Sequence, residues 1–255
     1  MFQRLFLSIP LLLSGLSISA QSEIHDYADV LSSTKPVVDF GLLNEVDGPK
    51  TVRFYVKNVS ERPTALLKVR PTCGCTAADF DKEEFAPGDS AWIDLTYDPT
   101  RRPGRFEKGV RIYPTEGNMI RVNISGVVLA SPETIEMMYP VDAGLLHLSE
   151  QTLMTLYPLD VDERILYLDV YNAGEHPVWV RLLSDYDAIS TQPFPSPVIP
   201  GEKGMIGIYL DPLKEPRTGS LDYRLPLLMT EDGSSALDTP GECRQFEIRL
   251  LSNKP

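Results

Sequence analysis

Apolar and polar residues alternate along several short stretches of this chain. In residues 51–58, the apolar residues Val52, Phe54 and Val56 alternate with charged or hydroxyl-bearing residues. A period of two places successive side chains on opposite faces of an extended chain. Three further apolar faces follow in the first half, formed by Ile93, Leu95 and Tyr97, by Val110 and Ile112, and by Ile120, Val122 and Ile124. These stretches are predicted to be half-buried β-strands.

The same pattern returns in the second half of the chain in the same order. Residues 51–58, followed by Pro63, correspond to residues 165–172, followed by Pro177, and residues 86–99 correspond to residues 199–212. The apolar faces of the second copy are formed by Leu166, Leu168 and Val170 and by Ile206, Ile208 and Leu210. A duplicated order of strands and turns indicates two domains built on one plan. A residue found in only one copy is then a candidate for function, because the fold forms without it.

Turn-forming sequences separate the predicted strands. They lie at residues 47–49, 86–89, 102–104 and 116–118 in the first half, and at residues 173–174, 200–201, 231–233 and 240–241 in the second. No long segment has helical periodicity. The pattern predicts an all-β fold of two tandem immunoglobulin-like antiparallel β-sandwiches. We expect the first over residues 36–130 and a diverged second one over residues 131–255.

The N-terminal residues have the order of an export signal. One cation, Arg4, precedes an apolar run from Leu5 to Leu13, and small residues lead to Ala20. This order predicts a signal peptide over residues 1–20, cleaved after Ala20, and a linker over residues 21–35. No other stretch is long enough to cross a bilayer. We therefore expect an exported protein, periplasmic or at the cell surface, with no transmembrane anchor.

The composition and the absence of common catalytic motifs exclude several classes of function. The chain has 255 residues, 42% of them hydrophobic, so each half can bury an ordinary core. The formal net charge of −12 argues against a nucleic acid partner. The sequence contains no nucleophile elbow, no phosphate-binding glycine loop and no H-E-x-x-H zinc motif. It predicts a protein that is not an enzyme and has no cofactor.

A pair of cysteines distinguishes the first copy from the second. The motif follows the predicted strand 66–70 and consists of Thr72, Cys73, Gly74, Cys75 and Thr76. Its counterpart, around residues 184–187, contains no sulfur. Because the second copy forms without thiols here, the motif is a candidate for function.

Three interpretations of this motif are open. It can be a structural turn, with partly buried thiols or a small disulfide ring that Gly74 allows by letting the backbone fold tightly. It can be a redox-active pair, or a soft-metal clamp for copper or zinc. The structural turn is favoured, because two ligands are weak evidence for a metal and the three histidines, His25, His147 and His176, have no ligand spacing. The third cysteine, Cys243, is expected to be a buried core thiol.

Several motifs of the first half together resemble one bacterial family. They are Phe40-Gly41, Val56-Lys57-Asn58, residues 69–76, Ala86-Pro87-Gly88, residues 97–104 and Phe106-Glu107-Lys108. The set is similar to the family called domain of unknown function 1573, over residues 37–129. That family resembles the ASH, major sperm protein and PapD-type immunoglobulin-like sandwiches. The resemblance implies a fold and an exported location but supplies no reaction, and the second half departs from the pattern at residues 185–188.

Aromatic residues at outward-facing positions of the second copy suggest a binding surface. Tyr167 and Tyr171 stand where the first copy has Arg53 and Lys57, and Trp179 lies on the next predicted strand. Tyr and Trp are favoured at interfaces. The alternative is that the first sandwich, or a long loop of the second, lies across this face. We therefore predict an exported, non-catalytic module that binds a protein partner in the cell envelope. The alternative is a periplasmic thiol-redox or copper-handling protein that uses Cys73 and Cys75.

Overall fold

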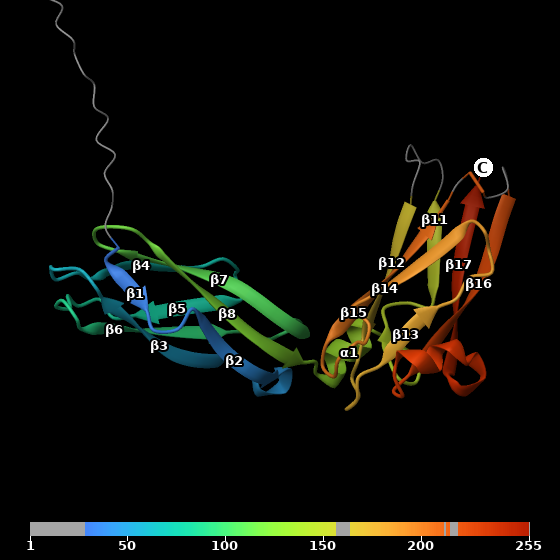
Figure 1. The fold of residues 1–255 in the computed structure, drawn as a ribbon, viewed down its shortest axis with the longest axis horizontal. Coiled ribbons are helices and arrows are strands. Elements are labelled where there is room, and N and C mark those ends of the chain that lie inside the picture. Colours follow the sequence, from blue (N-terminus) through green and yellow to red (C-terminus); the bar gives the residue numbers. More distant parts are fainter. Residues whose placement is uncertain (1–28, 157–163, 212, 215–218, 255) are drawn as a thin grey trace, which may run out of the picture.

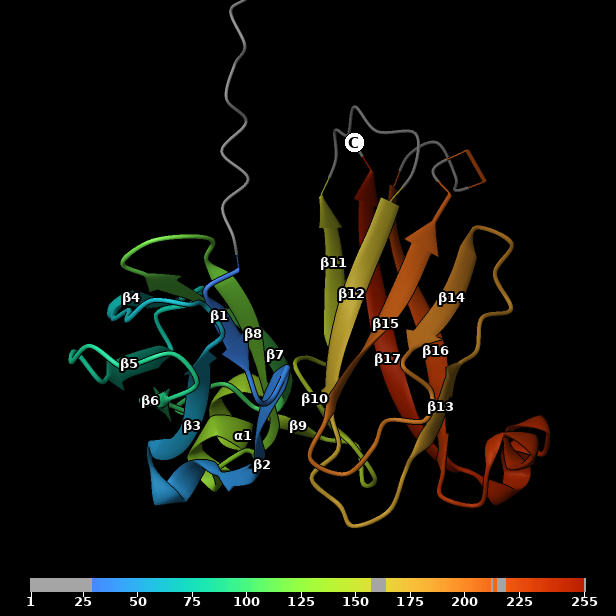
Figure 2. The same ribbon diagram turned by 60° about the vertical axis from the view of Figure 1, so that its left-hand side comes forward.

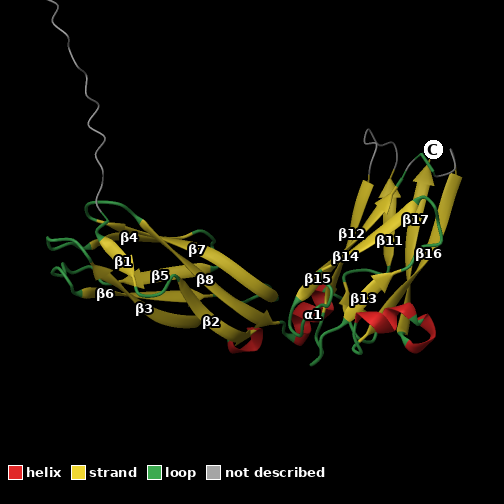
Figure 3. Cartoon of the chain, in the orientation of Figure 1, coloured by secondary structure: helices red, strands yellow, loops and turns green. Residues whose placement is uncertain are grey.

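The computed structural model describes residues 29–156, 164–211, 213–214 and 219–254. The predicted signal peptide and residues 21–28 of the predicted linker lie outside these ranges. Within them, β-strands dominate, and the single α-helix, α1, spans only Pro132–Met138 (Figure 3). No described helix has the length and apolar character needed to cross a membrane.

The first part of the chain forms two sheets with the strand orders β1-β3-β6-β5 and β2-β8-β7-β4. We call them the first sheet pair; Figure 1 shows them in blue to green. The strands are β1 (Leu31–Ser33), β2 (Val37–Asn44), β3 (Lys50–Asn58), β4 (Leu66–Pro71), β5 (Thr76–Phe80), β6 (Ser90–Tyr97), β7 (Gly104–Pro114) and β8 (Ile120–Leu129). A 3-10 turn, η1 (Glu45–Asp47), joins β2 to β3.

The remaining strands form the second sheet pair, with the orders β14-β15-β12-β10-β9 and β11-β17-β16-β13. Figures 1 and 2 show it in yellow to red beside the first pair. Its strands are β9 (Val141–Asp142), β10 (His147–Leu148), β11 (Thr152–Leu156), β12 (Arg164–Tyr171), β13 (Trp179–Leu182), β14 (Ile189–Phe194), β15 (Lys203–Leu210), β16 (Gly219–Thr230) and β17 (Arg244–Lys254). Two 3-10 turns, η2 (Ser234–Asp238) and η3 (Pro240–Glu242), lie between β16 and β17.

Each sheet pair encloses its own hydrophobic core. The first core includes Phe54, Val56, Ile93, Leu95, Tyr97, Val110, Ile112, Val122 and Ile124. The second includes Leu168, Val170, Ile206, Ile208, Leu210, Leu225, Leu227, Ile248 and Leu250. The predicted apolar faces are thus buried, with Val52, Ile120 and Leu166 only partly so. The all-β prediction is confirmed, and the domain limits at residues 36, 130 and 131 stay a prediction.

The two sheet pairs share one strand order. When β2 to β8 are matched in order with β11 to β17, any two of these strands that are hydrogen-bonded neighbours in the first pair correspond to two neighbours in the second. Most described strand pairs are antiparallel, as expected, but β2 and β8 are parallel, and so are β11 and β17. The same departure from the antiparallel pattern therefore occurs at the same edge in both copies.

A buried asparagine stabilises the same corner of each copy. The Nδ2 group of Asn58 donates hydrogen bonds to the carbonyl oxygens of Arg62 (2.8 Å) and Phe85 (3.1 Å). Asn172 repeats this arrangement with the carbonyls of His176 and Val198, both at 2.8 Å. Buried polar groups are tolerated when they are hydrogen-bonded, so this pair of interactions accounts for the repeated Asn in the sequence.

Candidate functional site

The cysteine motif lies where the chain crosses from one sheet of the first pair to the other. Thr72 follows β4 and is tied to β7, because its N–H donates to the carbonyl of Gly109 (2.9 Å) and its Oγ1 accepts from the Gly109 N–H (3.2 Å). Thr76 begins β5. The carbonyl of Cys75 accepts from the N–H of Asp98 at the end of β6 (2.9 Å). The motif is therefore anchored to both sheets.

Cys73 and Cys75 form a disulfide. Their Cα atoms are 5.3 Å apart, within the normal range for this bond. Cys75 is only 6% exposed and belongs to the first core, whereas Cys73 is half-buried and Gly74 is exposed. The Thr76 hydroxyl lies 3.4 Å from the Cys73 sulfur. The small disulfide ring thus closes one end of the first core.

The second copy makes the same crossing without sulfur. Leu183 donates its N–H to Pro226, and Ala188 accepts from the N–H of Asp211, which repeats the two backbone bonds of Thr72 and Cys75. Ala188 takes the buried place of Cys75. Tyr186 packs edge-on against Tyr223 of β16, with ring centroids 4.8 Å apart. An aromatic contact therefore stands where the first copy has the disulfide.

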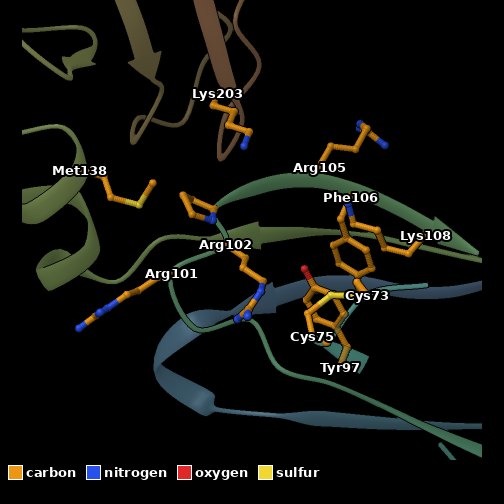
Figure 4. A pocket seen from close by; sticks show the side chains of 12 residues that line it. Cys73, Cys75, Tyr97, Arg101, Arg102, Arg105, Phe106, Lys108, Met138 and Lys203 are labelled. Carbon is orange, nitrogen blue, oxygen red and sulfur yellow. A yellow bond between two sulfur atoms is a disulfide. The ribbon is translucent and has the colours of Figure 1, made fainter. Parts of the chain in front are cut away.

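The disulfide borders a cleft of about 550 Å³ between the two sheet pairs. The first pair contributes Cys73, Gly74, Cys75, Tyr97, Arg101, Arg102, Pro103, Arg105, Phe106 and Lys108, while Met138 comes from α1 and Lys203 from β15. Figure 4 shows Cys73 and Cys75 beside the stacked rings of Tyr97 and Phe106, with Lys203 on the opposite side. Residues distant in sequence therefore build one recess.

The cleft is positively charged, although the whole chain is strongly acidic. Five of its lining residues are Arg or Lys, and the chain has a net charge of −12. Arg102 lies 3.6 Å from the carboxylate of Asp98, and Arg105 lies 2.6 Å from that of Glu202. Within the described residues, Arg101, Lys108 and Lys203 have no such partner. The recess is suited to an anionic group.

Arg101 is held in an uncommon backbone conformation at the rim of the cleft. Its φ is 56°, and in the described residues it is the only non-glycine position with a positive φ. Its N–H donates to Glu45 Oε1 (2.7 Å). Such conformations persist where surrounding contacts enforce them, and they cluster at functional sites. The turn at residues 98–102 is therefore fixed by Glu45.

Glu45 joins this turn to the segment that leads into the second sheet pair. Its carboxylate also accepts from the Ser131 N–H (2.8 Å) and the Thr134 hydroxyl (2.6 Å) at the start of α1. Burial opposes the charged form, but the hydrogen bonds from Thr134, Arg101 and Ser131 outweigh it, so the pKa of Glu45 lies below its ordinary value. Glu45 thus positions the wall of the cleft as an anion with several donors.

A group of aromatic rings forms the floor of the cleft. Tyr97 stacks on Phe106 with centroids 3.9 Å apart, and Phe40 packs against both at 5.9 and 6.1 Å. Burial raises the pKa of the Tyr97 hydroxyl. These rings are nearly fully buried. They support the cleft and leave its charged side chains as the groups that a ligand meets.

The three predicted binding aromatics do not come together. Tyr167 lies on the outer face of β12 and is 52% exposed. Trp179 is half-buried and lies on β13 in the opposite sheet. Tyr171 is only 2% exposed, so the prediction that it faces solvent is wrong. Their proposed role in binding therefore has to be considered one residue at a time.

Tyr171 is covered by the segment between the two sheet pairs. Its ring stacks on Tyr139, directly after α1, with centroids 5.4 Å apart, and its hydroxyl accepts from the Ala130 N–H (2.9 Å). Burial raises the pKa of Tyr171 and raises that of Tyr139 to about 12. A Cβ atom at Gly201 would collide with the side chain of Leu129, so the two pairs approach closely here. Alternation within β12 cannot reveal such a cover.

The chemistry available at the motif is limited by the disulfide. No group of three or more His, Cys, Asp or Glu side chains in the described ranges is arranged to hold a metal ion. Both sulfurs of Cys73 and Cys75 are used in their mutual bond, so neither is a thiolate ligand in this state. Cys243 is a free thiol, half-buried rather than in the core as predicted, and donates to the Ala236 carbonyl (3.2 Å).

Sequence reasoning missed the cleft. Residues 102–104 read as a turn, and Lys203 follows a turn in the other half of the chain. The available signal was a local concentration of cations, at Arg101, Arg102, Arg105 and Lys108, in an acidic chain. Without knowledge of the packing, that signal does not indicate that Lys203 faces the same recess.

Solved structures with partial similarity come from several organisms. A protein of unknown function from Porphyromonas gingivalis W83 is 15% identical, with a TM-score of 0.38 over 88% of this chain and 100% of that one. The CupB2 chaperone of Pseudomonas aeruginosa is 13% identical, with a TM-score of 0.31 over 87% and 100% of the two chains. A human CEP192 ASH/PapD-like domain is 11% identical, with a TM-score of 0.32 over 44% and 85%. No conclusion about function rests on similarities this low.

No curated protein matches the sequence. A family match covers the part of the chain that forms the first sheet pair and contains the cysteine motif. Residues 31–128 of this chain match the model of the family described as protein of unknown function (DUF1573).

Proposed function

We propose that this is an exported, non-catalytic module that binds a protein partner in the cell envelope. The partner would lie on the outer face of β12, β15 and β14, which we call the apolar face. Export rests on the N-terminal sequence pattern alone. The binding role is supported by one observation: an uncovered apolar surface that continues into the basic cleft.

The apolar face is formed by residues that stand opposite each other on neighbouring strands. Tyr167 is opposite Gly207, Ile165 is opposite Tyr209, and Phe194 is opposite Met205. Ile165 is 55% exposed, Tyr167 52% and Phe194 70%. Exposed apolar patches mark interaction sites. Asp169, opposite Met205, adds an exposed carboxylate to this face. Tyr and Phe side chains also offer large contact areas at a low cost in conformational entropy.

Gly207 leaves space beside Tyr167 on this face. A Cβ atom there would lie 3.8 Å from Ile165 and 4.0 Å from Tyr167. The absence of a side chain produces a shallow place between the exposed residues. A partner side chain can enter it and contact the Tyr167 ring, the geometry in which aromatic residues become binding hot spots.

Strand β15 connects the apolar face to the cleft. Lys203, Met205 and Gly207 alternate along this strand and therefore point to the same side of the sheet. Lys203 lines the cleft, and Met205 belongs to the apolar face. A partner segment that follows β15 would thus place an acidic group near Lys203 and apolar side chains against Tyr167.

Site-specific photo-crosslinking in the native host tests this proposal. A crosslinker at position 167 should give one discrete protein adduct, and the same group at position 55 should not. Tyr55 is the matched control, because it is 47% exposed on the equivalent sheet of the first pair. The substitutions Phe194→Ser and Ile165→Ser should remove the adduct. Equal crosslinking from both positions, or none from position 167, would contradict the proposal.

A thiol-redox role of Cys73 and Cys75 is a second candidate. The observation in its favour is that the pair is oxidised and borders an open cleft. A copper-binding role requires thiolates, so the disulfide favours redox chemistry over metal handling. Thiol labelling of the protein taken directly from the exporting cell separates the possibilities. A substantial reduced fraction supports a redox role, whereas complete oxidation supports a structural disulfide.

A further inference from the structure

Three arginines stand in one row across the outer face of the first sheet pair. Arg70 on β4 is opposite Arg111 on β7, and Arg111 is opposite Arg121 on β8. All three side chains are exposed. Adjacent strands are about 4.8 Å apart, so the three Cα atoms span only about 10 Å. We call these residues the arginine row.

Such a row is unfavourable by itself. Like charges directly opposite each other on neighbouring strands repel and destabilise the sheet. In the part of the chain that the structure describes, no carboxylate forms an ion pair with Arg70, Arg111 or Arg121. The acidic residue Glu107 lies on the same face of β7, but its carboxylate accepts from the Asn123 side chain (3.0 Å). Within the described residues, the row is therefore not neutralised by a direct ion pair.

The second sheet pair has a facing pair of arginines on the corresponding strands, and there the charges are neutralised. Arg224 on β16 is opposite Arg249 on β17. Here Arg224 pairs with Glu247 (3.1 Å), and Arg249 pairs with Asp222 (2.7 Å). One copy thus supplies each arginine of the pair with an acidic neighbour.

The row is also held in place beside the cysteine motif. A Cβ atom at Gly109 would lie 2.9 Å from both Nε and Nη2 of Arg121, so the guanidinium lies directly over this glycine. Gly109 is the residue that exchanges hydrogen bonds with Thr72. A side chain at position 109 would displace the guanidinium. Glycine therefore permits a flat arrangement of Arg121 that a larger residue would exclude.

We propose that Arg70, Arg111 and Arg121 bind a compact group of phosphates. A guanidinium offers parallel N–H donors that match phosphate oxygens, and each phosphate monoester carries between one and two negative charges near neutral pH. Two or three phosphates within about 10 Å would balance the row. A long polyanion such as nucleic acid is disfavoured, because the chain as a whole carries a net charge of −12.

Phosphates of this kind can come from a soluble oligophosphate or from a lipid headgroup. Calorimetry with tripolyphosphate probes the first source. Flotation with phosphatidylcholine vesicles that contain phosphatidic acid probes the second. Both experiments use the mature full-length chain at low ionic strength, since salt weakens such contacts.

The decisive variant is Arg111→Gln with Arg121→Gln, and the matched control is Arg224→Gln with Arg249→Gln. The first variant should weaken binding at least about tenfold, as expected for the loss of two charge-assisted contacts, while the control should stay within about twofold. Loss of tripolyphosphate binding in the first variant alone supports a soluble ligand, and loss of vesicle binding alone supports a lipid. Equal losses in both variants, or no binding of either probe by the unaltered protein, would overturn the proposal.

Thermal unfolding distinguishes a loss of phosphate binding from a loss of stability in the variant. Removing facing like charges relieves repulsion, so Arg111→Gln with Arg121→Gln should not lower the Tm without ligand. Tripolyphosphate should raise the Tm of the unaltered protein and leave that of the variant unchanged. A Tm increase of equal size in both proteins would contradict binding at the arginine row.

Discussion

The outer faces of two equivalent sheets differ sharply, although the cores behind them follow one plan. In the first copy, Arg53 on β3 pairs with Asp94 on β6 (2.6 Å) and lies over the Trp92 ring, 4.6 Å from its centroid. The corresponding strands of the second copy, β12 and β15, present Ile165 and Tyr167 instead. Both copies keep an apolar core, but their outer faces have diverged. The face of the first copy carries polar side chains, and that of the second carries exposed apolar ones.

On the other sheet of each pair, it is the second copy whose outer face is neutralised and the first whose outer face is not. There the second copy is neutralised by Asp222 and Glu247, and the first is left charged. Each copy thus has one outer face whose charged side chains form ion pairs with each other. Its other outer face carries unpaired arginines in the first copy and exposed apolar side chains in the second. We regard the unsatisfied faces as the surfaces open to ligands, because repetition of the fold shows that neither is needed for folding.

The feature that the two copies share, a buried hydrogen-bonded asparagine, can be tested by substitution. Asn58→Ala and Asn172→Ala should each lower the free energy of unfolding of their own sheet pair by about 3 kcal/mol, because two buried carbonyls lose their donor. The chain has two tryptophans, Trp92 in the first pair and Trp179 in the second. Denaturation of Trp92→Phe and Trp179→Phe backgrounds therefore reports on each pair separately.

The control for this experiment is Asn44→Ala, since Asn44 is exposed. It should change the free energy of unfolding by less than about 0.5 kcal/mol. If only one of the two buried asparagines proved costly to remove, the copies would not share the same stabilising corner.

The attachment between the copies depends on Glu45, and its removal should have the next largest effect. Glu45→Ala should destabilise the first pair by about 2 kcal/mol, because three donors lose a buried acceptor. The matched control is Glu107→Ala, which removes an exposed carboxylate. A loss no greater than that of the control would show that Glu45 does not hold the junction.

Stability should also depend on pH through Glu45. Its folded-state pKa is lowered, so its contribution is present above the unfolded value of about 4.3 and is lost as the pH falls through the folded-state pKa. Denaturation midpoints should therefore fall less steeply with acid in Glu45→Gln than in the unaltered protein. Parallel pH profiles would contradict this assignment.

The cysteine difference is expected to have a moderate effect confined to one copy. Cys73→Ala with Cys75→Ala should cost about 2 kcal/mol, the chain-entropy value for a very short disulfide loop. The Trp92 signal should report this loss, and the Trp179 signal should not change. A loss seen equally by both tryptophans would show that the disulfide supports the junction rather than the first core.

The apolar face should matter least for stability. Tyr167→Ser and Tyr55→Ser should each change the free energy of unfolding by less than about 0.5 kcal/mol, because both side chains are about half exposed. Denaturation of the two variants checks this expectation. A much larger loss for Tyr167→Ser would indicate that its ring is needed for packing and would weaken the case for a docking surface.

The strands and their duplication were predictable because they are local properties. The alternate spacing of Val52, Phe54 and Val56 predicts a buried face. The second copy repeats that spacing with other residues of similar size. The disulfide was one of three interpretations of the motif, and choosing among them required the turn geometry around Gly74. Cys243 was expected in the core because free cysteines are usually buried, but its thiol is half-buried.

Tyr171 shows most clearly where sequence reasoning ended. Its position at the end of an alternating strand predicts exposure, but Tyr139 and Ala130 cover it. The cleft and the arginine row are similar cases, since Lys203 faces Cys73, and Arg70 faces Arg111, only after the sheets have formed. Contacts between distant segments depend on register and packing, which no single stretch of sequence encodes.

The amino-acid sequence by itself determined the all-β class, the repeated order of strands and the presence of sulfur in one copy, because side-chain periodicity and turn residues act over a few neighbours. Tertiary structure alone decided which charges are neutralised, which aromatic rings are covered and where the cleft lies. Those outcomes depend on which strands become neighbours, and a shift in register by one residue would reverse every one of these faces.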